Sequence, residues 1–105
     1  MDDNEHISIQ IITHAGNARS KCFEAIKSSK SGDFNQSSEL MAEAQLSFTE
    51  AHKIHAQLIQ REAAGESVIM TLLLSHAEDQ SMNAEMSRDM ANEIIDLHKL
   101  ISEIK

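Results

Sequence analysis

Four polar side chains that could take part in a reaction share one helical face in the C-terminal third of this 105-residue chain. His76, Asp79, Gln80 and Asn83 follow one another at spacings of three and four residues, within a stripe that is otherwise apolar. A neutral imidazole such as that of His76 is a nucleophile that can accept a phosphoryl group, and the amide of Gln80, one turn later, can donate a hydrogen bond to the phosphoryl oxygens. This spacing makes His76 and Gln80 candidates for such a reaction, although a lone histidine on a helix is more often structural or solvated.

Asp79 is the second candidate for chemistry, because no Lys or Arg lies three or four residues from it. A carboxylate in an apolar stripe is unfavourable unless it is paired or bound to a metal ion. If copies of this helix met about a symmetry axis, their carboxylates would converge and could bind a divalent cation, and oxygen ligands favour Mg²⁺. A structural alternative is a polar layer that only sets register and oligomeric state.

The element that must position these residues is a predicted helix over residues 68–104, which contains no Gly or Pro. Ser67 is its expected N-cap. The apolar members of its stripe are Ile69, Leu72, Met86, Met90, Leu97, Leu100 and Ile104. Further apolar residues lie off the stripe, so the helix needs partners on two sides, and self-association is expected to supply one of them.

Two more amphipathic helices are predicted before it, over residues 4–30 and 34–63. Gly32 is expected to stop the first, Asp33 and Gln36 to cap the second, and Gly65 to follow it. Short connections make neighbouring helices antiparallel. The sequence therefore predicts an all-α, up-down-up three-helix subunit that forms a single domain, 1–105. The face expected to be buried in the first helix consists of Ile7, Ile11, Ala15, Ala18, Cys22, Ala25 and Ser29.

The composition excludes several classes of function. A formal net charge of −8 disfavours binding to nucleic acid and to anionic membrane surfaces. No apolar run approaches the ~20 residues that a membrane span requires, and the acidic start lacks the pattern of a signal peptide. Cys22 is the only cysteine, which excludes an internal disulfide and a thiolate metal cluster. A cytoplasmic protein without direct membrane insertion is expected.

Three segments, in order along the chain, resemble one known family. HAEDQSMN, over residues 76–83, is similar to the HAQDHLMT segment of the lactose/cellobiose (chitobiose)-type enzyme IIA proteins of the bacterial phosphoenolpyruvate-dependent sugar phosphotransferase system. GNARSKCFEAIKSSKSGDF, over residues 16–34, resembles the family's G-x-A-R-S helix and Gly-Asp-Phe turn. EAHKIHAQLIQREAAGE, over residues 50–66, resembles the end of its second helix.

This resemblance implies a homotrimer of three-helix subunits, a nine-helix bundle with a metal ion on its threefold axis. It implies that His76 is the phosphorylated histidine and that Asp79 holds the axial ion. The family takes a phosphoryl group from the phosphocarrier HPr and passes it to a cysteine of enzyme IIB during uptake of a β-linked disaccharide of the lactose, cellobiose and chitobiose class. Glu78, Gln80, Ser81 and Asn83 stand where the family pattern has Gln, His, Leu and Thr.

Other functions remain as alternatives on the sequence alone. The main alternative is a non-catalytic helical interaction or regulatory module, in which the polar layer serves assembly alone. A histidine phosphotransfer domain would show H-x-x-K-G, and a ferritin-like oxidase would show E-x-x-H; neither pattern occurs. His52 and His55 form an H-x-x-H pair with the spacing of metal ligands, for which a polar helix face is the simpler interpretation.

Overall fold

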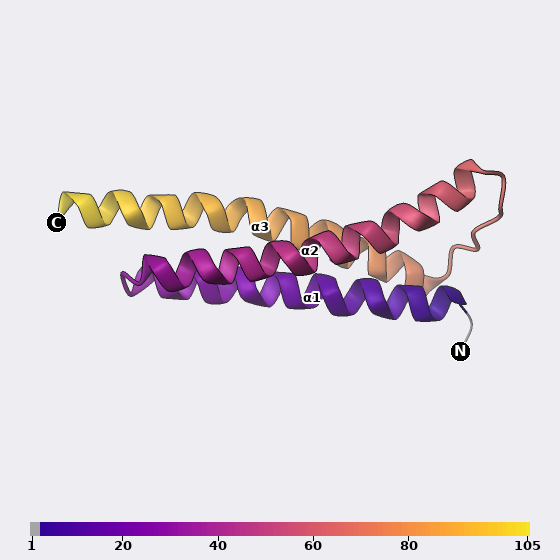
Figure 1. Ribbon diagram of the computed structural model, residues 1–105, viewed down its shortest axis with the longest axis horizontal. Coiled ribbons are helices and arrows are strands. Elements are labelled where there is room, and N and C mark those ends of the chain that lie inside the picture. The colour runs from indigo at the N-terminus through magenta and orange to yellow at the C-terminus, as the bar shows by residue number, and fades with distance from the viewer. Residues whose placement is uncertain (1–2) are drawn as a thin grey trace.

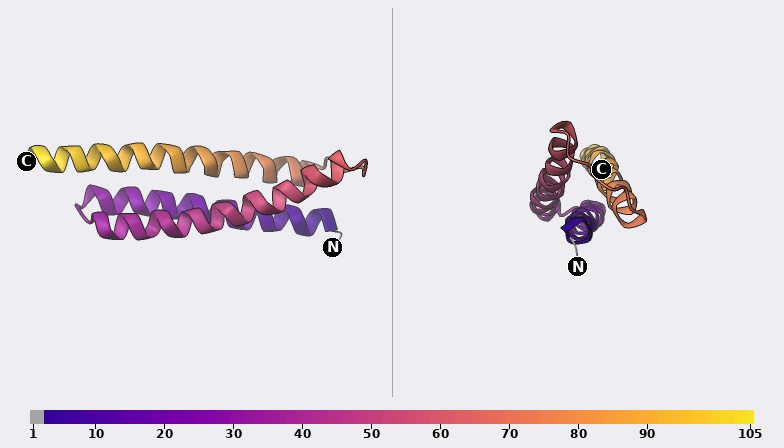
Figure 2. Two further views of the ribbon diagram at one scale, coloured as in Figure 1. Left: turned by 45° about the horizontal axis from the view of Figure 1, so that its top comes forward. Right: turned by 90° about the vertical axis from the view of Figure 1, so that its right-hand side faces the viewer.

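The computed structural model describes residues 3–105 as three long helices in one elongated bundle, α1 (Asp3–Lys30), α2 (Phe34–Ala63) and α3 (Leu72–Ile104) (Figure 1). Viewed along the bundle, the helices stand at the corners of a triangle (Figure 2). The all-α, up-down-up prediction is confirmed. The first two residues of the predicted domain, 1–2, lie outside the described residues. No helix within residues 3–105 is both long enough and apolar enough to span a membrane.

The turn between α1 and α2 forms as its sequence predicts. Gly32 has a positive φ of 84°, which residues with a side chain rarely adopt, and it closely follows the end of α1. The carboxylate of Asp33 then accepts a hydrogen bond of 3.0 Å from the backbone N–H of Gln36. This cap satisfies one of the free N–H groups at the start of α2. Together, the turn at Gly32 and the cap at Asp33 let the chain reverse its direction between the two helices.

The start of α3 differs from the prediction. The helix begins at Leu72 rather than residue 68, and its N-cap is Thr71, whose hydroxyl accepts a 3.0 Å hydrogen bond from the N–H of Leu74. The prediction of Ser67 as the N-cap is therefore wrong. Ser67 and Thr71 are both residue types that cap helices, so packing decides which of them begins α3. Val68 lies in the connecting segment and packs against the core. β-branched residues such as Val68 also disfavour helix.

The core of the subunit is narrow and built largely from small side chains. All seven residues of the predicted buried face of α1 are buried, as is Ser8. They contact alanines of the other helices, and the buried alanines of α2 and α3 are Ala44, Ala51, Ala77, Ala84 and Ala91. Larger buried residues lie at the two ends of the bundle, with Leu58 and Leu74 at one end and Leu40 and Ile95 at the other.

Candidate functional site

His76 lies in the second turn of α3, exposed on the side that faces away from α1 and α2. It borders an open hollow of about 560 Å³ that Leu72 and Leu73 also line. Leu72 is 89% exposed, so the surroundings of the imidazole are apolar yet open to solvent. A macromolecule can therefore reach the ring, as a protein-to-protein transfer reaction requires.

Asp79 and Asn83 share the outward side of α3 with His76, and all three are exposed. The polar residues predicted to lie together are thus on one face, with Gln80 partly buried at its edge. Within residues 3–105, the Asp79 carboxylate has no hydrogen bond or ion pair, and no three His, Cys, Asp or Glu residues are grouped as a metal site would need. In one subunit Asp79 therefore supplies one carboxylate, which suits a metal ion only if several copies share it.

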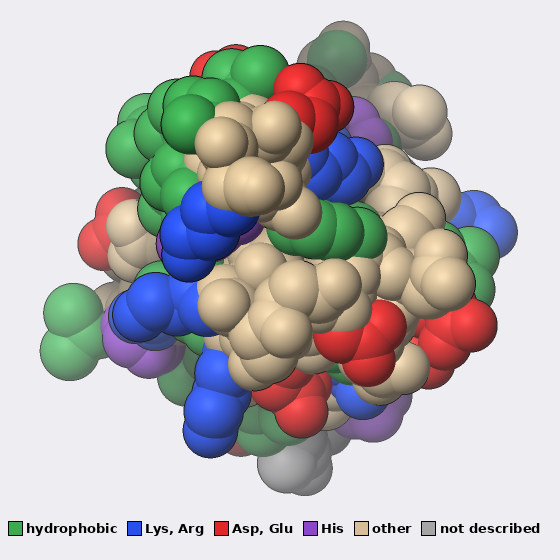
Figure 3. Space-filling model, turned by 90° about the vertical axis from the view of Figure 1, so that its left-hand side faces the viewer, with side chains coloured by type: hydrophobic (Ala, Val, Ile, Leu, Met, Phe, Trp, Pro, Cys, Tyr) green, Lys and Arg blue, Asp and Glu red, His purple; other side chains and the backbone are tan. Residues whose placement is uncertain are grey.

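The apolar part of the same stripe also faces outward. Its exposed members beyond the polar residues are Met86, Met90, Leu97, Leu100 and Ile104. Seen from the end of the bundle at which α3 terminates, hydrophobic side chains gather on the α3 side of the molecule (Figure 3). The face of α3 that packs inside the subunit is a different one, and it consists of Leu74, Ala77, Ala84, Ala91 and Ile95. Exposed apolar side chains along one side of a helix are typical of a protein–protein interface.

Glu78 points to the α2 side of α3, where it meets a residue that no sequence pattern connects with it. Its carboxylate oxygen Oε1 lies 3.0 Å from Nε2 of His55. The two residues are 23 positions apart, so only the register of antiparallel α2 and α3 brings them together. A possible cation and an anion in the sequence could have suggested this contact. The sequence does not give the register of α2 against α3, so the pairing could not be predicted.

The H-x-x-H pair on α2 does not act as a unit. His55 contacts Glu78, whereas His52 is exposed and stacks on Phe48 with ring centroids 6.2 Å apart. The Phe48 ring also lies 4.3 Å from the guanidinium carbon of Arg88 on α3. These contacts support the interpretation of the pair as a polar helix face.

Cys22 is a further potential nucleophile. It is buried against Ala44 and Ala91. Burial raises the pKa of its thiol, and the positive charge of Arg88 opposes this only in part. A protonated thiol is a poor nucleophile, so Cys22 is a packing residue.

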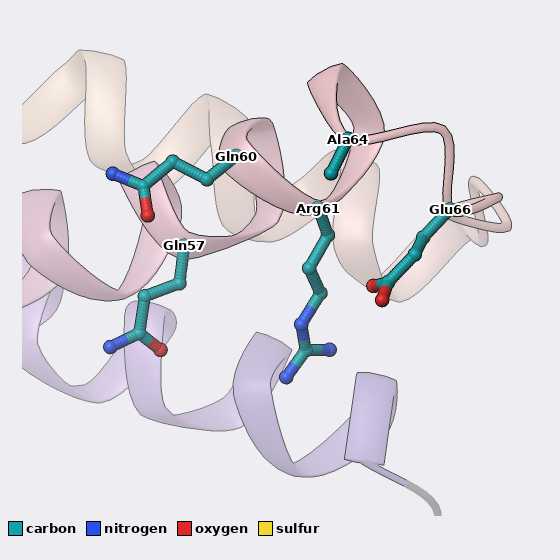
Figure 4. A pocket seen from close by; sticks show the side chains of 5 residues that line it. All are labelled: Gln57, Gln60, Arg61, Ala64 and Glu66. Carbon is teal, nitrogen blue, oxygen red and sulfur yellow. The ribbon is translucent and has the colours of Figure 1, made fainter.

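A second hollow, of about 350 Å³, lies at the end of α2 and is lined by Gln57, Gln60, Arg61, Ala64 and Glu66 (Figure 4). The Arg61 side chain extends toward the first turns of α1, and Glu66 comes from the segment that follows α2 (Figure 4). None of the candidate residues lines this hollow.

Comparison with known protein families gives a match over most of the chain. The family described as "PTS system, Lactose/Cellobiose specific IIA subunit" matches residues 6–99. The chain belongs to this family. Its IIA proteins are phosphotransferase components of the sugar phosphotransferase system (PTS), and this PTS IIA chain falls in their lactose, cellobiose and chitobiose class.

Curated relatives agree with this assignment over nearly the full length. The PTS IIA chain is 45% identical over 102 residues to the lichenan-specific phosphotransferase enzyme IIA component of Bacillus subtilis, which covers 97% of this chain and 93% of the relative. It is 31% identical over 98 residues to the N,N'-diacetylchitobiose-specific EIIA component of Escherichia coli K12, covering 93% of this chain and 84% of the relative.

Solved structures share the fold. The crystal structure of the PTS cellobiose-specific enzyme IIA from Bacillus anthracis has a TM-score of 0.96 at 40% identity, covering 98% of this chain and 94% of that one. A IIA(Chitobiose) protein, solved in complex with HPr from the Escherichia coli phosphotransferase system, has a TM-score of 0.83 at 28% identity, with coverage of 97% and 99%.

Proposed function

We propose that this protein is the phosphoryl carrier of a cytoplasmic sugar phosphotransferase relay, with His76 as the residue that carries the phosphoryl group. It accepts the group from HPr and passes it to a cysteine of enzyme IIB, for uptake of a β-linked disaccharide of the lactose, cellobiose and chitobiose class. The observation that carries this proposal is the exposure of His76 on the outward face of α3, in a chain of the IIA family. The solved IIA–HPr complex of a relative supports HPr as the donor.

In the proposed reaction, a neutral imidazole nitrogen of His76 attacks the phosphorus atom carried by HPr. The new N–P bond forms as the bond to HPr breaks, and the electron pair of that bond leaves with HPr. In the second transfer, the cysteine sulfur of enzyme IIB attacks phosphorus, and the imidazole of His76 leaves with the N–P electron pair. The ring is exposed on the single chain, and in the trimer proposed below both partner proteins would reach it in a groove between subunits.

Gln80 is proposed to orient the phosphoryl group. It lies one helical turn after His76 at the edge of the same face, and its side-chain amide can donate a hydrogen bond to a phosphoryl oxygen. Loss of one such hydrogen bond typically costs about 1 kcal/mol. Gln80→Ala is therefore expected to slow transfer roughly five- to tenfold.

We further propose that the subunit forms a homotrimer whose α3 helices bring their outward stripes together. The exposed apolar stripe and the narrow alanine core support self-association, and the number of three rests on the family resemblance. In such an assembly the three Asp79 carboxylates would hold a divalent ion, with Mg²⁺ the expected metal. The ion would neutralise the converging carboxylates and stabilise the trimer.

The phosphoryl carrier is tested by incubating the protein with phosphoenolpyruvate, enzyme I and HPr, and measuring its mass. The wild type and a His52→Gln control are expected to gain one acid-labile phosphoryl group, whereas His76→Gln gains none. No gain by the wild type, or a gain that survives His76→Gln, would refute the proposal.

The metal site is tested without any transfer reaction. Chelator is expected to lower the melting temperature of the wild-type assembly, because the Asp79 carboxylates then repel one another. Asp79→Asn removes these charges, so its melting temperature should not respond to chelator. An equal response of the two proteins would exclude Asp79 as the ligand.

A further inference from the structure

The contact between His55 and Glu78 joins α2 to α3 two residues beyond the proposed phosphoryl acceptor. Nε2 of His55 and Oε1 of Glu78 are 3.0 Å apart, and their side chains are 25% and 38% exposed. Among residues 3–105, this is the one side-chain hydrogen bond between these two helices; the side-chain bond from Asn17 to Ser47 joins α1 to α2 instead.

Glu78 carries a negative charge close to a position that would receive another. His76 and Glu78 project from opposite sides of α3, so their functional groups are separated by about the diameter of a helix, on the order of 10 Å. Charges at that separation still interact across a protein surface, although salt weakens the interaction. A phosphoryl group brings further negative charge, so an uncompensated Glu78 would disfavour its transfer to His76.

His55 is placed to compensate this charge. A carboxylate only accepts hydrogen bonds, so the imidazole must present its Nε2–H to Glu78, either as the neutral tautomer protonated there or as the imidazolium. In both forms the carboxylate is held against α2, on the side of α3 that is remote from His76. Asp79 lacks any such partner among the described residues. Of these two neighbouring acids, only Glu78 therefore has its carboxylate held by another side chain.

We propose that His55 is a positioning residue for the phosphoryl site, which acts by holding the charge of Glu78 away from His76. This inference rests on the proposed phosphoryl transfer to His76. It gives α2 a function in the reaction, and it explains how this chain carries Glu78 where the family segment that it resembles has Gln. A residue at position 55 thereby tunes the rate of a reaction that it does not touch.

The test measures the rate of phosphoryl uptake from phosphorylated HPr by four variants beside the wild type. His55→Ala is expected to slow uptake roughly three- to tenfold, because it leaves Glu78 uncompensated. Glu78→Gln, which removes the charge, should match or slightly exceed the wild type. The double variant His55→Ala/Glu78→Gln should return to within about twofold of the wild type. His52→Ala, on the same helix and exposed, has no hydrogen bond or ion pair to α3 among the described residues; it is the matched control and should not change the rate.

The salt dependence of the uptake rate distinguishes this electrostatic function of His55 from a purely structural one. Raising the ionic strength should shrink the ratio between the wild-type and His55→Ala rates, because it screens the charge of Glu78. If His55→Ala fails to fold, His55→Phe keeps a ring without a hydrogen-bond donor, and its slower uptake should likewise be rescued by Glu78→Gln.

The outcomes separate this inference from the function on which it rests. A double variant as slow as its His55 parent would show that His55 only joins the helices, and would overturn the inference. Equal rates for the wild type and the His55 variants would do the same while leaving the phosphoryl carrier intact. A wild type that takes up no phosphoryl group from HPr would overturn both.

Discussion

The two faces of α3 differ in a way that is opposite to the usual arrangement of a helix in a monomer. The inner face is mostly alanine, with Ala77, Ala84 and Ala91 buried between leucine and isoleucine at its ends. The outer face carries large side chains that remain exposed, of which Met86 and Leu97 are typical at 62% and 57%. The inner face allows close approach of three helices, and the outer face has apolar surface that the subunit itself cannot bury.

In the proposed trimer, this difference would separate folding of the subunit from its assembly. Small side chains in the core contribute little burial per residue, so the isolated subunit is expected to be modestly stable. The larger contribution is available only when outer faces meet. The polar residues His76, Asp79 and Asn83 lie on the outer face and not on the inner one. The proposed chemistry would therefore take place at the surface that the proposed assembly uses.

The largest effect is expected from placing charge on the outer face. Leu97→Glu/Leu100→Glu should dissociate the proposed trimer, because each buried leucine contributes roughly 1.5–3 kcal/mol and a buried charge adds a further penalty. The dissociation constant should rise at least ~100-fold. Sedimentation analysis measures this. Asn92→Glu, an exposed position on the flank of the same helix, is the control and should retain the assembly. A wild type that sediments as a monomer would contradict the comparison.

A substitution on the inner face should affect the fold instead. Ala84 is 1% exposed and packs against Ala15, Ala18 and Ala51, so Ala84→Leu must push the helices apart. The free energy of unfolding should fall by about 1–3 kcal/mol. Urea denaturation in the monomeric double-glutamate background measures this without a contribution from assembly.

Met86→Leu is the matched change on the outer face for this experiment. In the same monomeric background its side chain has no partner to clash with, so the free energy of unfolding should stay within about 0.5 kcal/mol of the parent. Equal losses for Ala84→Leu and Met86→Leu would mean that the two faces are not distinct in solution.

Features set by periodicity within one helix were predictable from the sequence. The buried face of α1 agrees with its prediction residue by residue, because positions three and four apart must share a side. On α3 the same rule identified the apolar stripe and the polar residues within it. It could not predict which of the two apolar faces the subunit buries, because that depends on how closely α1 approaches α3. Ala84 and Ala91 are also only weakly hydrophobic, so their pattern gave a weak signal.

Features set by contacts between helices were not predictable in this way. The pairing of His55 with Glu78 requires the register of α2 against α3, which no local pattern encodes. The predicted start of α3 was wrong because Ser67 and Thr71 are both good N-caps, each preceding apolar residues. Packing of Val68 against the core selects the second. The assignment of His76 and Asp79 as site residues stays a prediction, to be tested by the phosphoryl gain and the response to chelator.

The smallest effect concerns the cap that fixes where both faces of α3 begin. Thr71→Ala removes the hydroxyl that accepts from the N–H of Leu74, so the free energy of unfolding should fall by about 1 kcal/mol. Ser67→Ala should leave it unchanged, because α3 begins after that residue. Urea denaturation of the two variants in the monomeric background makes the comparison. A larger loss for Ser67→Ala would place the start of the helix one turn earlier, and the apolar stripe would then extend as helix through Ile69 before it reaches the polar residues.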